Sequence, residues 1–109
     1  MATVNIDPRK CFELIEENKD NPEFVILDVR GPDEHGQGHV KDSILIELQS
    51  PDFKSKLEEL DKDKIYLVYC RSGVRSAKAA KVMEEMGFNN ICTMDKGFTY
   101  WVACGLPQE

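Results

Sequence analysis

The fold is decided by one stretch of the sequence, Ile65-Tyr66-Leu67-Val68-Tyr69 followed directly by Cys70-Arg71-Ser72-Gly73-Val74-Arg75-Ser76. An unbroken run of apolar and aromatic residues predicts a strand that is buried on both faces of a sheet. A helix is predicted after the loop, because four apolar residues recur at i, i+3, i+4 and i+7: Ala79, Val82, Met83 and Met86. A buried strand followed by a helix is typical of an α/β protein with a parallel sheet.

The same alternation of short apolar runs and helical patterns continues on both sides of this stretch. Further strands are expected at residues 4–6, 24–27, 44–46 and 91–94, and helices after Asp7, from Pro51 and over residues 97–104. Residues 31–38 are polar and rich in Gly, which predicts a loop or a short helical turn. No linker, repeat or low-complexity segment interrupts the pattern, so we expect one domain over residues 1–109.

Composition and charge narrow the classes of partner. The chain has 14 Lys and Arg against 20 Asp and Glu, a net charge of −6, whereas binding to nucleic acid requires clustered positive charge. No apolar run approaches the ~18 residues that cross a bilayer. Residues 1–5 lack the basic and apolar segments of a secretory signal. We therefore expect a cytoplasmic protein with neither a nucleic acid nor a membrane as its partner.

The four cysteines are predicted to be reduced thiols: Cys11, Cys70, Cys92 and Cys104. No two of them form a CxxC pair, and no His stands at zinc-ligand spacing from any of them, so neither a structural zinc site nor structural disulfides are expected. Free cysteines usually serve as small core residues. That role is expected for Cys11 on an apolar helix face, for Cys92 inside a strand and for Cys104.

Cys70 has a different setting from the other three cysteines. It follows a buried strand at the edge where open α/β sheets place their ligand sites, and it precedes a helix whose N-terminal N–H groups favour an anion. Comparable sites lower the pKa of a thiol from ~8.5 into the range ~3.5–7.5. Arg71 and Arg75 add permanent positive charge and fork-shaped donors for oxyanions, and Gly73 permits a tight turn. The alternative, a buried core thiol with solvated arginines, explains this polar loop poorly.

Three motifs, which together span nearly the whole chain, resemble those of rhodanese-type sulfurtransferases. The first is the loop Cys70–Ser76, which resembles the active loop of the family. The second is Ile26-Leu27-Asp28-Val29-Arg30 with Glu34-His35 and Gly38-His39-Val40, and the third is residues 94–107, with Gly97, Trp101, Gly105, Leu106 and Pro107. The resemblance implies a five-stranded parallel sheet flanked by helices on both faces, with Cys70 as the sulfur carrier.

The chain departs from the family pattern at a few positions. Lys41-Asp42 stands where the family often has Pro-Gly, Glu47 where it often has Pro, and Lys96 replaces the first Gly of a common pair. These differences bear on the acceptor surface and on nearby loop shapes, and they leave the carrier cysteine in place.

The resemblance implies covalent catalysis in two half-reactions. The Cys70 thiolate would take the outer sulfur of a small anionic donor, thiosulfate or a persulfide, and the resulting persulfide would pass that sulfur to cyanide, a thiol or a protein. The loop residues Ser72, Gly73 and Val74 would hold the persulfide anion through their N–H groups, as an oxyanion hole does. Arg71 and Arg75 would attract the donor, with Arg75 folding back across the loop mouth. No metal or organic cofactor is implied.

Residues beyond the loop receive weaker assignments. Asp28 and Arg30 end the neighbouring strand and would either brace the loop or form a surface ion pair. His35 and His39 are more simply explained as loop or packing residues than as proton carriers, because the sequence shows no partner to orient them.

Two other functions stay open at this stage. A phosphatase or arsenate reductase of the C-x5-R type would use the same thiolate, but Ser76 occupies the sixth position after Cys70 and Arg75 comes one residue early. A persulfide carrier or regulatory module would bind a partner protein and turn over little thiosulfate. Fold alone cannot decide between these chemistries.

Overall fold

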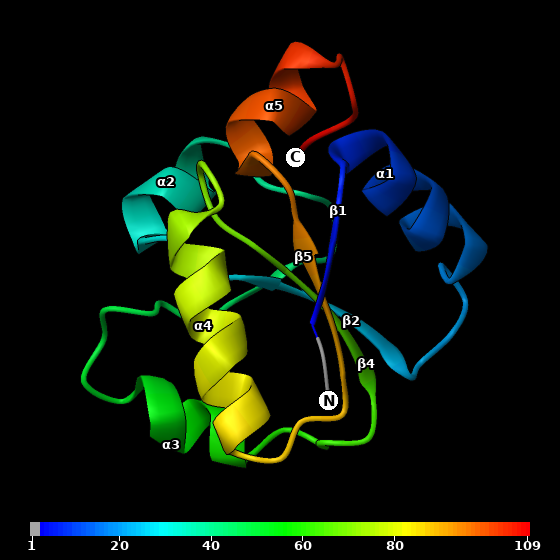
Figure 1. Ribbon diagram of the computed structural model, residues 1–109. Helices are drawn as coiled ribbons and strands as arrows, with labels where there is room; N and C mark the ends of the chain where they lie inside the picture. The colour runs from blue at the N-terminus through cyan, green and yellow to red at the C-terminus, as the bar shows by residue number, and fades with distance from the viewer. Residues whose placement is uncertain (1–2) are drawn as a thin grey trace.

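The computed structural model describes residues 3–109, in which strands and helices alternate along the chain (Figure 1). Met1 and Ala2, which belong to the stretch considered for a signal and to the expected 1–109 domain, lie outside the described residues. The elements are β1 (Val4–Ile6), α1 (Pro8–Glu17), β2 (Phe24–Asp28), α2 (Pro32–Gln37), β3 (Ile44–Leu45), α3 (Phe53–Glu58), β4 (Ile65–Tyr69), α4 (Val74–Glu85), β5 (Asn90–Met94) and α5 (Gly97–Ala103).

The strands form one five-stranded sheet in the order β1-β5-β4-β2-β3, and every pair of neighbours is parallel. β4 lies at its centre between β5 and β2, and its residues 66–69 are buried. Strand pairing sets Tyr69 opposite Asp28, so the ends of β4 and β2 lie side by side at the carboxyl edge of the sheet. The predicted parallel α/β sheet is therefore confirmed, with β4 as its central strand.

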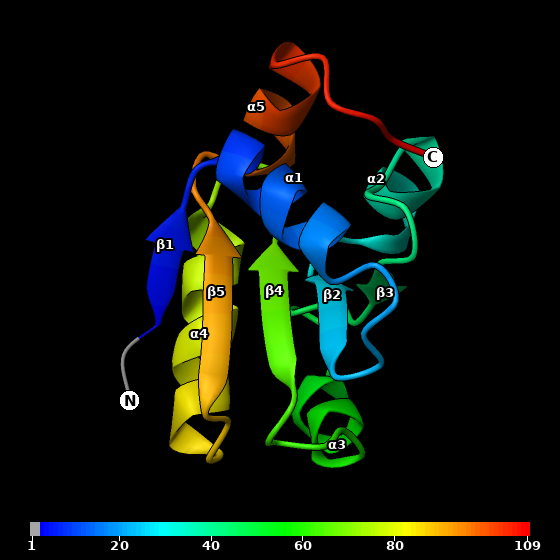
Figure 2. The ribbon, with the colours of Figure 1, turned by 90° about the vertical axis from the view of Figure 1, so that its right-hand side faces the viewer.

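Side chains that alternate along the strands build a core on each face of the sheet. Val68 of β4 packs against α3 and α4, which contribute Leu57 and Met83, while Leu67 packs against α1 and α5, which contribute Cys11 and Trp101. Figure 2 shows α1 in front of the sheet and α3 and α4 behind it, with α5 at its upper end. This period of two follows from strand geometry, since successive side chains point to opposite faces.

Some boundaries differ from those predicted. The helix expected from Pro51 begins at Phe53, because Asp52 has φ −101° and ψ 18° and is not helical. Residues 32–37 form a helix inside the predicted loop or turn, and the strand expected at 44–46 is limited to Ile44–Leu45. In the described part of the chain, no helix is long and apolar enough to span a bilayer.

The core role expected for three cysteines holds for two of them. Cys11 is fully buried, as predicted, and Cys92, inside β5, is partly buried and packs against the same core cluster. The prediction is wrong for Cys104, which is only partly buried. Cys104 is the C-terminal cap of α5, where the helix ends at the surface.

The Lys41-Asp42 departure keeps the turn that Pro-Gly would favour. The N–H of Ser43 donates to the carbonyl of Val40 at 3.0 Å, which closes a four-residue turn, and Asp42 at its third position has φ 66°. A left-handed third residue is the signature of a type II turn, which favours Gly there. Asp tolerates this conformation better than most residues, but its Cβ still makes the left-handed backbone unfavourable in free energy.

Replacing the residue in the left-handed position should therefore stabilise the protein. Asp42→Gly is expected to raise the free energy of unfolding by roughly 1 kcal/mol, since Gly adopts a positive φ without steric cost. Urea denaturation of the wild type, Asp42→Gly and Lys41→Gly measures the effect. Lys41 is the matched control, because it is exposed and has no positive φ. An equal gain in both variants would contradict the explanation.

Candidate active site

The loop at residues 70–76 connects the central strand to a long helix at the carboxyl edge of the sheet. β4 ends at Tyr69, and α4 begins at Val74 after Gly73, which is the N-cap residue and has φ 102°. The positive φ of Gly73 turns the chain back on itself, as only Gly does readily. As a result, the first N–H groups of α4 are directed towards the side chain of Cys70, where the helix dipole also favours negative charge.

The sulfur of Cys70 is hydrogen-bonded within its own loop. The Gly73 N–H donates to Sγ at 3.0 Å, and the thiol donates to Oγ of Ser76 at 3.6 Å. Burial disfavours the thiolate, but hydrogen bonds from the Ser76 hydroxyl and from the N–H groups of Ser76, Gly73 and Ser72 outweigh it, and the pKa of the thiol falls below its usual value. The loop thus stabilises a sulfur anion.

Ser76 is the one buried side-chain hydroxyl next to this sulfur among the described residues. It is 1% exposed, and its Oγ–H donates to the carbonyl of Gly73 at 3.2 Å. A neutral thiol can donate to Oγ in this arrangement. When the thiol ionises, the hydroxyl proton can rotate towards the sulfur instead. Ser76 belongs to the motif quoted above, but sequence reasoning gave it no role.

Cys70 itself is buried, contrary to the argument that its polar neighbours exclude a core position. Its exposure is 0%, and it belongs to the same core cluster as Val68 and Met83. The side chains of Arg71 and Ser72 are exposed while the cysteine continues the inward alternation of β4, which is why the composition of the loop misled that argument. The sulfur is therefore covered from solvent in this conformation.

The first turn of α5 holds the outer side of the loop. The N–H of Phe98 donates to the carbonyl of Cys70 at 2.8 Å, and that of Thr99 donates to the carbonyl of Arg71 at 3.0 Å. This approach requires Gly97, where an added Cβ would lie 2.5 Å from the Arg71 oxygen and 2.6 Å from the Cys70 oxygen. Lys96, which replaces a family Gly, takes φ 60° immediately before it.

Asp28 and Arg30 form a buried ion pair, and the surface alternative is wrong. Asp28 is 0% and Arg30 4% exposed, and Nε and Nη2 of Arg30 donate to the carboxylate at 2.8–3.1 Å. Burial opposes ionisation of Asp28, but hydrogen bonds from Arg30 and His35 hold the pKa of this carboxyl below its usual value. The Arg30 guanidinium stacks on Phe98 at 4.6 Å. The pair therefore contacts the residue that holds the carbonyl of Cys70.

Tyr69 links the same ion pair to the end of β4. Its hydroxyl donates to Asp28 at 3.1 Å and accepts the N–H of Val40 at 3.0 Å. Burial first, and then the charge of Asp28, raise the pKa of Tyr69 to about 12. His35 contacts Asp28 through Nδ1 at 2.8 Å and stacks on His39, with ring centroids 3.9 Å apart. Both histidines therefore pack in the α2 segment, and His35 has the orienting carboxylate that the sequence did not reveal.

The two loop arginines have different surroundings. Nη1 and Nη2 of Arg75 donate to the two carboxylate oxygens of Glu34 in α2 at 2.7 and 2.9 Å. The sequence predicts that the guanidinium of Arg75 folds back across the loop mouth. In the structure it is bound to Glu34 instead and is not free. Arg71 is exposed and forms no ion pair within residues 3–109. Glu34 was quoted in the upstream motif without a role, and its 41-residue separation from Arg75 hides the contact from sequence patterns.

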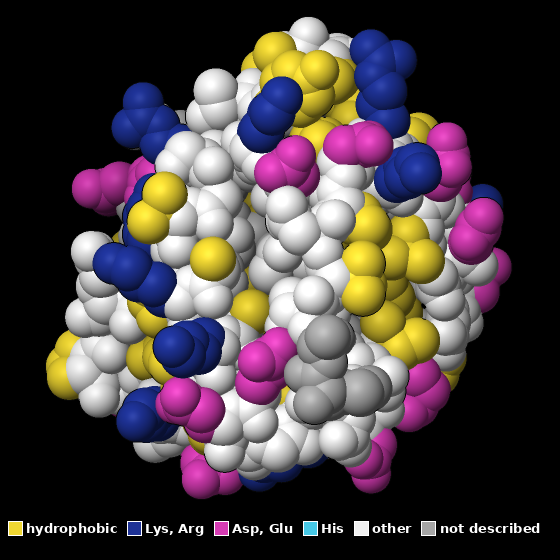
Figure 3. Space-filling model, viewed as in Figure 1, with side chains coloured by type: hydrophobic (Ala, Val, Ile, Leu, Met, Phe, Trp, Pro, Cys, Tyr) yellow, Lys and Arg dark blue, Asp and Glu magenta, His cyan; other side chains and the backbone are white. Residues whose placement is uncertain are grey.

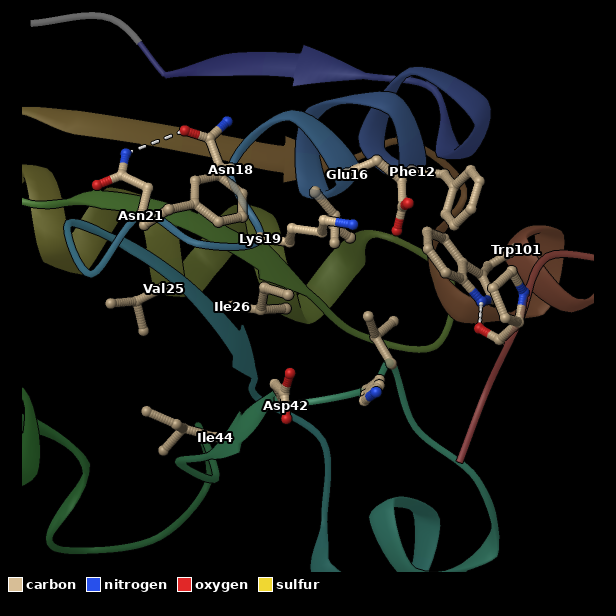
Figure 4. A pocket seen from close by; sticks show the side chains of 15 residues that line it. Phe12, Glu16, Asn18, Lys19, Asn21, Val25, Ile26, Asp42, Ile44 and Trp101 are labelled. Atoms are coloured by element: carbon tan, nitrogen blue, oxygen red, sulfur yellow. Dashed lines mark hydrogen bonds between the residues drawn. The ribbon is translucent and has the colours of Figure 1, made fainter.

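A cavity of about 410 Å³ lies beside the loop, and we refer to it as the loop cavity. It is lined by Arg30, Glu34, Gln37, Gly38, Arg71, Phe98, Thr99 and Val102. Another cavity, of about 330 Å³, lies between α1 and the β2–β3 edge and is shown in Figure 4. Phe12 and Trp101 close one end of it, and no residue of the 70–76 loop lines it. A third cavity, of about 480 Å³, is lined by Ser72 and Gly73 of the same loop. Two cavities therefore border the 70–76 loop, and Cys70 itself lines neither of them.

A parallel α/β sheet with an activated cysteine in the loop after its central strand defines a class of thiol-dependent proteins, and comparison narrows that class. Residues 12–104 match the Rhodanese-like domain family. The chain belongs to this family.

Individual relatives agree with that assignment. The chain is 34% identical to the putative sulfurtransferase YtwF of Bacillus subtilis, over 88% of this chain and 90% of YtwF. It is 30% identical to the thiosulfate sulfurtransferase GlpE of Actinobacillus pleuropneumoniae, over 97% and 93% of the two chains. A rhodanese-related protein from Thermoplasma volcanium superposes with a TM-score of 0.80 at 30% identity, over 97% of each chain. A protein from Rhodopseudomonas palustris described as a possible tyrosine phosphatase superposes with a TM-score of 0.80 at 28% identity, over 98% and 85% of the chains.

The close approach at Gly97 can be tested by adding one methyl group. Gly97→Ala should destabilise the protein by about 2 kcal/mol or more, because the new Cβ meets backbone oxygens and the residue keeps a positive φ. Thermal unfolding measures the loss. Gly36→Ala is the matched control, since Gly36 lies inside α2 with nothing within 4 Å of its added Cβ. Similar stability of the two variants would show that α5 does not need this contact.

The hydroxyl of Ser76 should set the ionisation of Cys70. Ser76→Ala is expected to raise the pKa of the thiol by roughly one pH unit, because a hydrogen bond to a charged group is lost. The difference in ultraviolet thiolate absorbance between each protein and its Cys70→Ser counterpart, followed against pH, gives this pKa. Ser72→Ala, at an exposed loop side chain, should leave it in place.

The effect on stability has a definite sign. A lowered pKa stabilises the fold above the pKa of the unfolded thiol, and that contribution is lost as the pH falls through the folded pKa. Ser76→Ala should therefore lose stability relative to the wild type mainly at alkaline pH. A loss that is the same at acid and alkaline pH would assign Ser76 a packing role only.

Proposed function

We propose that this protein is a sulfurtransferase that carries sulfane sulfur as a persulfide on Cys70. One observation carries the proposal: a buried sulfur that accepts hydrogen bonds from the N-terminal turn of α4 and whose pKa is lowered by them. A thiolate is the nucleophile in sulfur transfer, and a persulfide is again an anion at the same place. The donors that stabilise the first anion are therefore positioned to stabilise the second.

The proposed reaction has two half-reactions that balance in atoms and charge. The Cys70 thiolate attacks the outer sulfur of thiosulfate, a new S–S bond forms, the old S–S bond breaks, and its electron pair leaves with sulfite. An acceptor thiolate or cyanide then attacks the outer sulfur of the persulfide and regenerates the Cys70 thiolate. Neither half-reaction requires a metal or an organic cofactor from the protein.

Other residues would act around this centre. The N–H groups of the loop residues Ser72, Gly73 and Val74 would hold the persulfide, and the exposed Arg71 would attract an anionic donor. Asp28 and Arg30 would act as positioning residues, since they contact Tyr69 and Phe98 on either side of Cys70. Arg75 would contribute to the field at Cys70 from its pair with Glu34.

The names of YtwF and GlpE support sulfur transfer as the reaction class. Thiosulfate as donor, a thiol or a protein as acceptor and the cytoplasm as the location are parts of the proposal. The phosphatase alternative has less support, because Arg75 stands five residues after Cys70 and its guanidinium is bound to Glu34. The tight cover over the sulfur also suits a single sulfur atom better than a tetrahedral phosphate.

The nucleophile can be identified by substitution. Cys70→Ser should abolish transfer of sulfur from thiosulfate to cyanide and the gain of one sulfur in intact mass after thiosulfate treatment. Cys11→Ser, Cys92→Ala and Cys104→Ser should keep most of both, because only Cys70 lies in the hydrogen-bonding loop; burial raises the pKa of Cys11 to about 12.

Three outcomes discriminate between the alternatives. Loss of activity in one of the other cysteine variants with a dispensable Cys70 would contradict the assignment. Efficient hydrolysis of an aryl phosphate by the wild type would favour the phosphatase. Slow turnover of thiosulfate with fast exchange from a protein persulfide would favour the carrier.

A further inference from the structure

A carboxylate, that of Glu34, occupies the wall of the loop cavity and binds Arg75 of the loop that carries Cys70. Glu34 binds Arg75 through both of its oxygens, and this hydrogen-bonded contact with Arg75 lowers the pKa of Glu34 to about 2. The carboxylate therefore stays ionised at any physiological pH. Its Oε1 also accepts the N–H of Gly31 at 3.1 Å, which fixes it to the first turn of α2.

The charges around the loop cavity nearly cancel. Arg30 is paired with Asp28, and Arg75, next to the cavity, is paired with Glu34. Of the Lys and Arg side chains that line the loop cavity, only Arg71 has no ion-pair partner among the described residues. Lys96 lines a separate cavity with Ser72 and Gly73, and its Nζ lies 5.0 Å from the centre of the Tyr100 ring. The loop cavity thus offers one net positive charge, which matches a donor with a single negative charge better than a dianion.

Part of the cavity wall is apolar. Phe98 and Val102 line the loop cavity from α5, and Val102 is 42% exposed. Figure 3 shows hydrophobic side chains gathered over α5, with Lys and Arg side chains beside them. An organic substituent on the donor would bury part of this surface, whereas thiosulfate has no group that could do so.

We propose that Glu34 determines which donors the loop accepts: by neutralising Arg75 it favours monoanionic organic sulfane donors over dianionic thiosulfate. The inference rests on the proposed function of Cys70 and adds the charge class of the donor to it. Glu34 acts here on specificity through the charge of the loop cavity and not as a catalytic residue.

Benzenethiosulfonate is a suitable monoanionic probe because its reaction parallels that of thiosulfate. The Cys70 thiolate attacks its terminal sulfur, the Cys–S–S⁻ bond forms, the S–S bond of the donor breaks, and the electron pair leaves with benzenesulfinate. The two donors thus make the same persulfide and differ by one negative charge and by an apolar group.

The test measures kcat/KM for both donors in four proteins: the wild type, Glu34→Gln, Arg75→Gln and the double variant. Glu34→Gln should raise the ratio of thiosulfate to benzenethiosulfonate activity roughly tenfold, since one more uncompensated cation attracts the dianion more. Arg75→Gln should lower the ratio by a similar factor. The double variant restores the net charge and should return the ratio close to that of the wild type.

The variants are chosen to preserve the fold. Gln keeps the oxygen that accepts the Gly31 N–H, and Glu or Gln serves equally at this helix position. Asp33→Asn is the matched control: Asp33 lies beside Glu34 in the first turn of α2, is exposed and does not line the loop cavity. It removes the same charge from the same helix and should leave the ratio unchanged.

The results separate this inference from the proposed function. A ratio unchanged by Glu34→Gln, or a double variant that does not return towards the wild type, would overturn the role of Glu34 even if both donors load Cys70. An equal shift in Asp33→Asn would show a general effect of net charge and would also overturn it. If neither donor adds a sulfur to the intact mass of the wild type, the proposed function itself fails.

Discussion

The loop after β4 has to turn its N–H groups towards a buried sulfur, and this constraint determines where its carbonyl groups go. The carbonyls of Cys70 and Arg71 point away from the sulfur and would be left without partners if nothing packed on the outer side of the loop. Two N–H groups in the first turn of α5, from Phe98 and Thr99, satisfy them. These two hydrogen bonds can form only because Gly97 has no side chain and adopts φ 64°. The position of α5 is therefore a consequence of the anion site on the opposite side of the loop.

The Asp28–Arg30 pair connects the neighbouring strand β2 to the elements on either side of the loop. A buried ion pair gains little over an apolar pair of similar volume, because both ions lose their hydration. Here the two side chains make four contacts that connect three segments: Tyr69 at the end of β4, His35 and the carbonyl of Gly38 in α2 and its C-cap, and the ring of Phe98 in α5. Every buried side-chain polar atom in residues 3–109 has a hydrogen-bond partner. Removing either ion would leave the other buried and unpaired, so the pair defines one arrangement of these segments around Cys70.

Local patterns were sufficient to predict the central strand, the strand-to-helix loop that carries Cys70 and the parallel sheet, because each depends on neighbouring residues. The uniform apolar run of β4 and the glycine before α4 carry that information directly. The burial of Cys70 was not predictable from the polarity of its loop, since the strand alternation that turns it inwards overrides composition. Glu34 and Arg75 are 41 residues apart, and only the packing of α2 beside the start of α4 brings them together. β3 has two residues because it pairs only with the end of β2.

Two kinds of electrostatic interaction, with different ranges, act around Cys70. The sulfur is stabilised by N–H dipoles and a hydroxyl at contact distance, in a place from which solvent is excluded. Such contacts are short in range and little screened by salt. The one unpaired cation of the loop cavity, Arg71, is exposed, and its attraction for an anion is screened within about 8 Å at physiological ionic strength. In the proposed function, these contacts would stabilise both the thiolate and the persulfide in an acidic chain of net charge −6, while the capture of a charged donor would depend on the few side chains that line the cavity beside the loop.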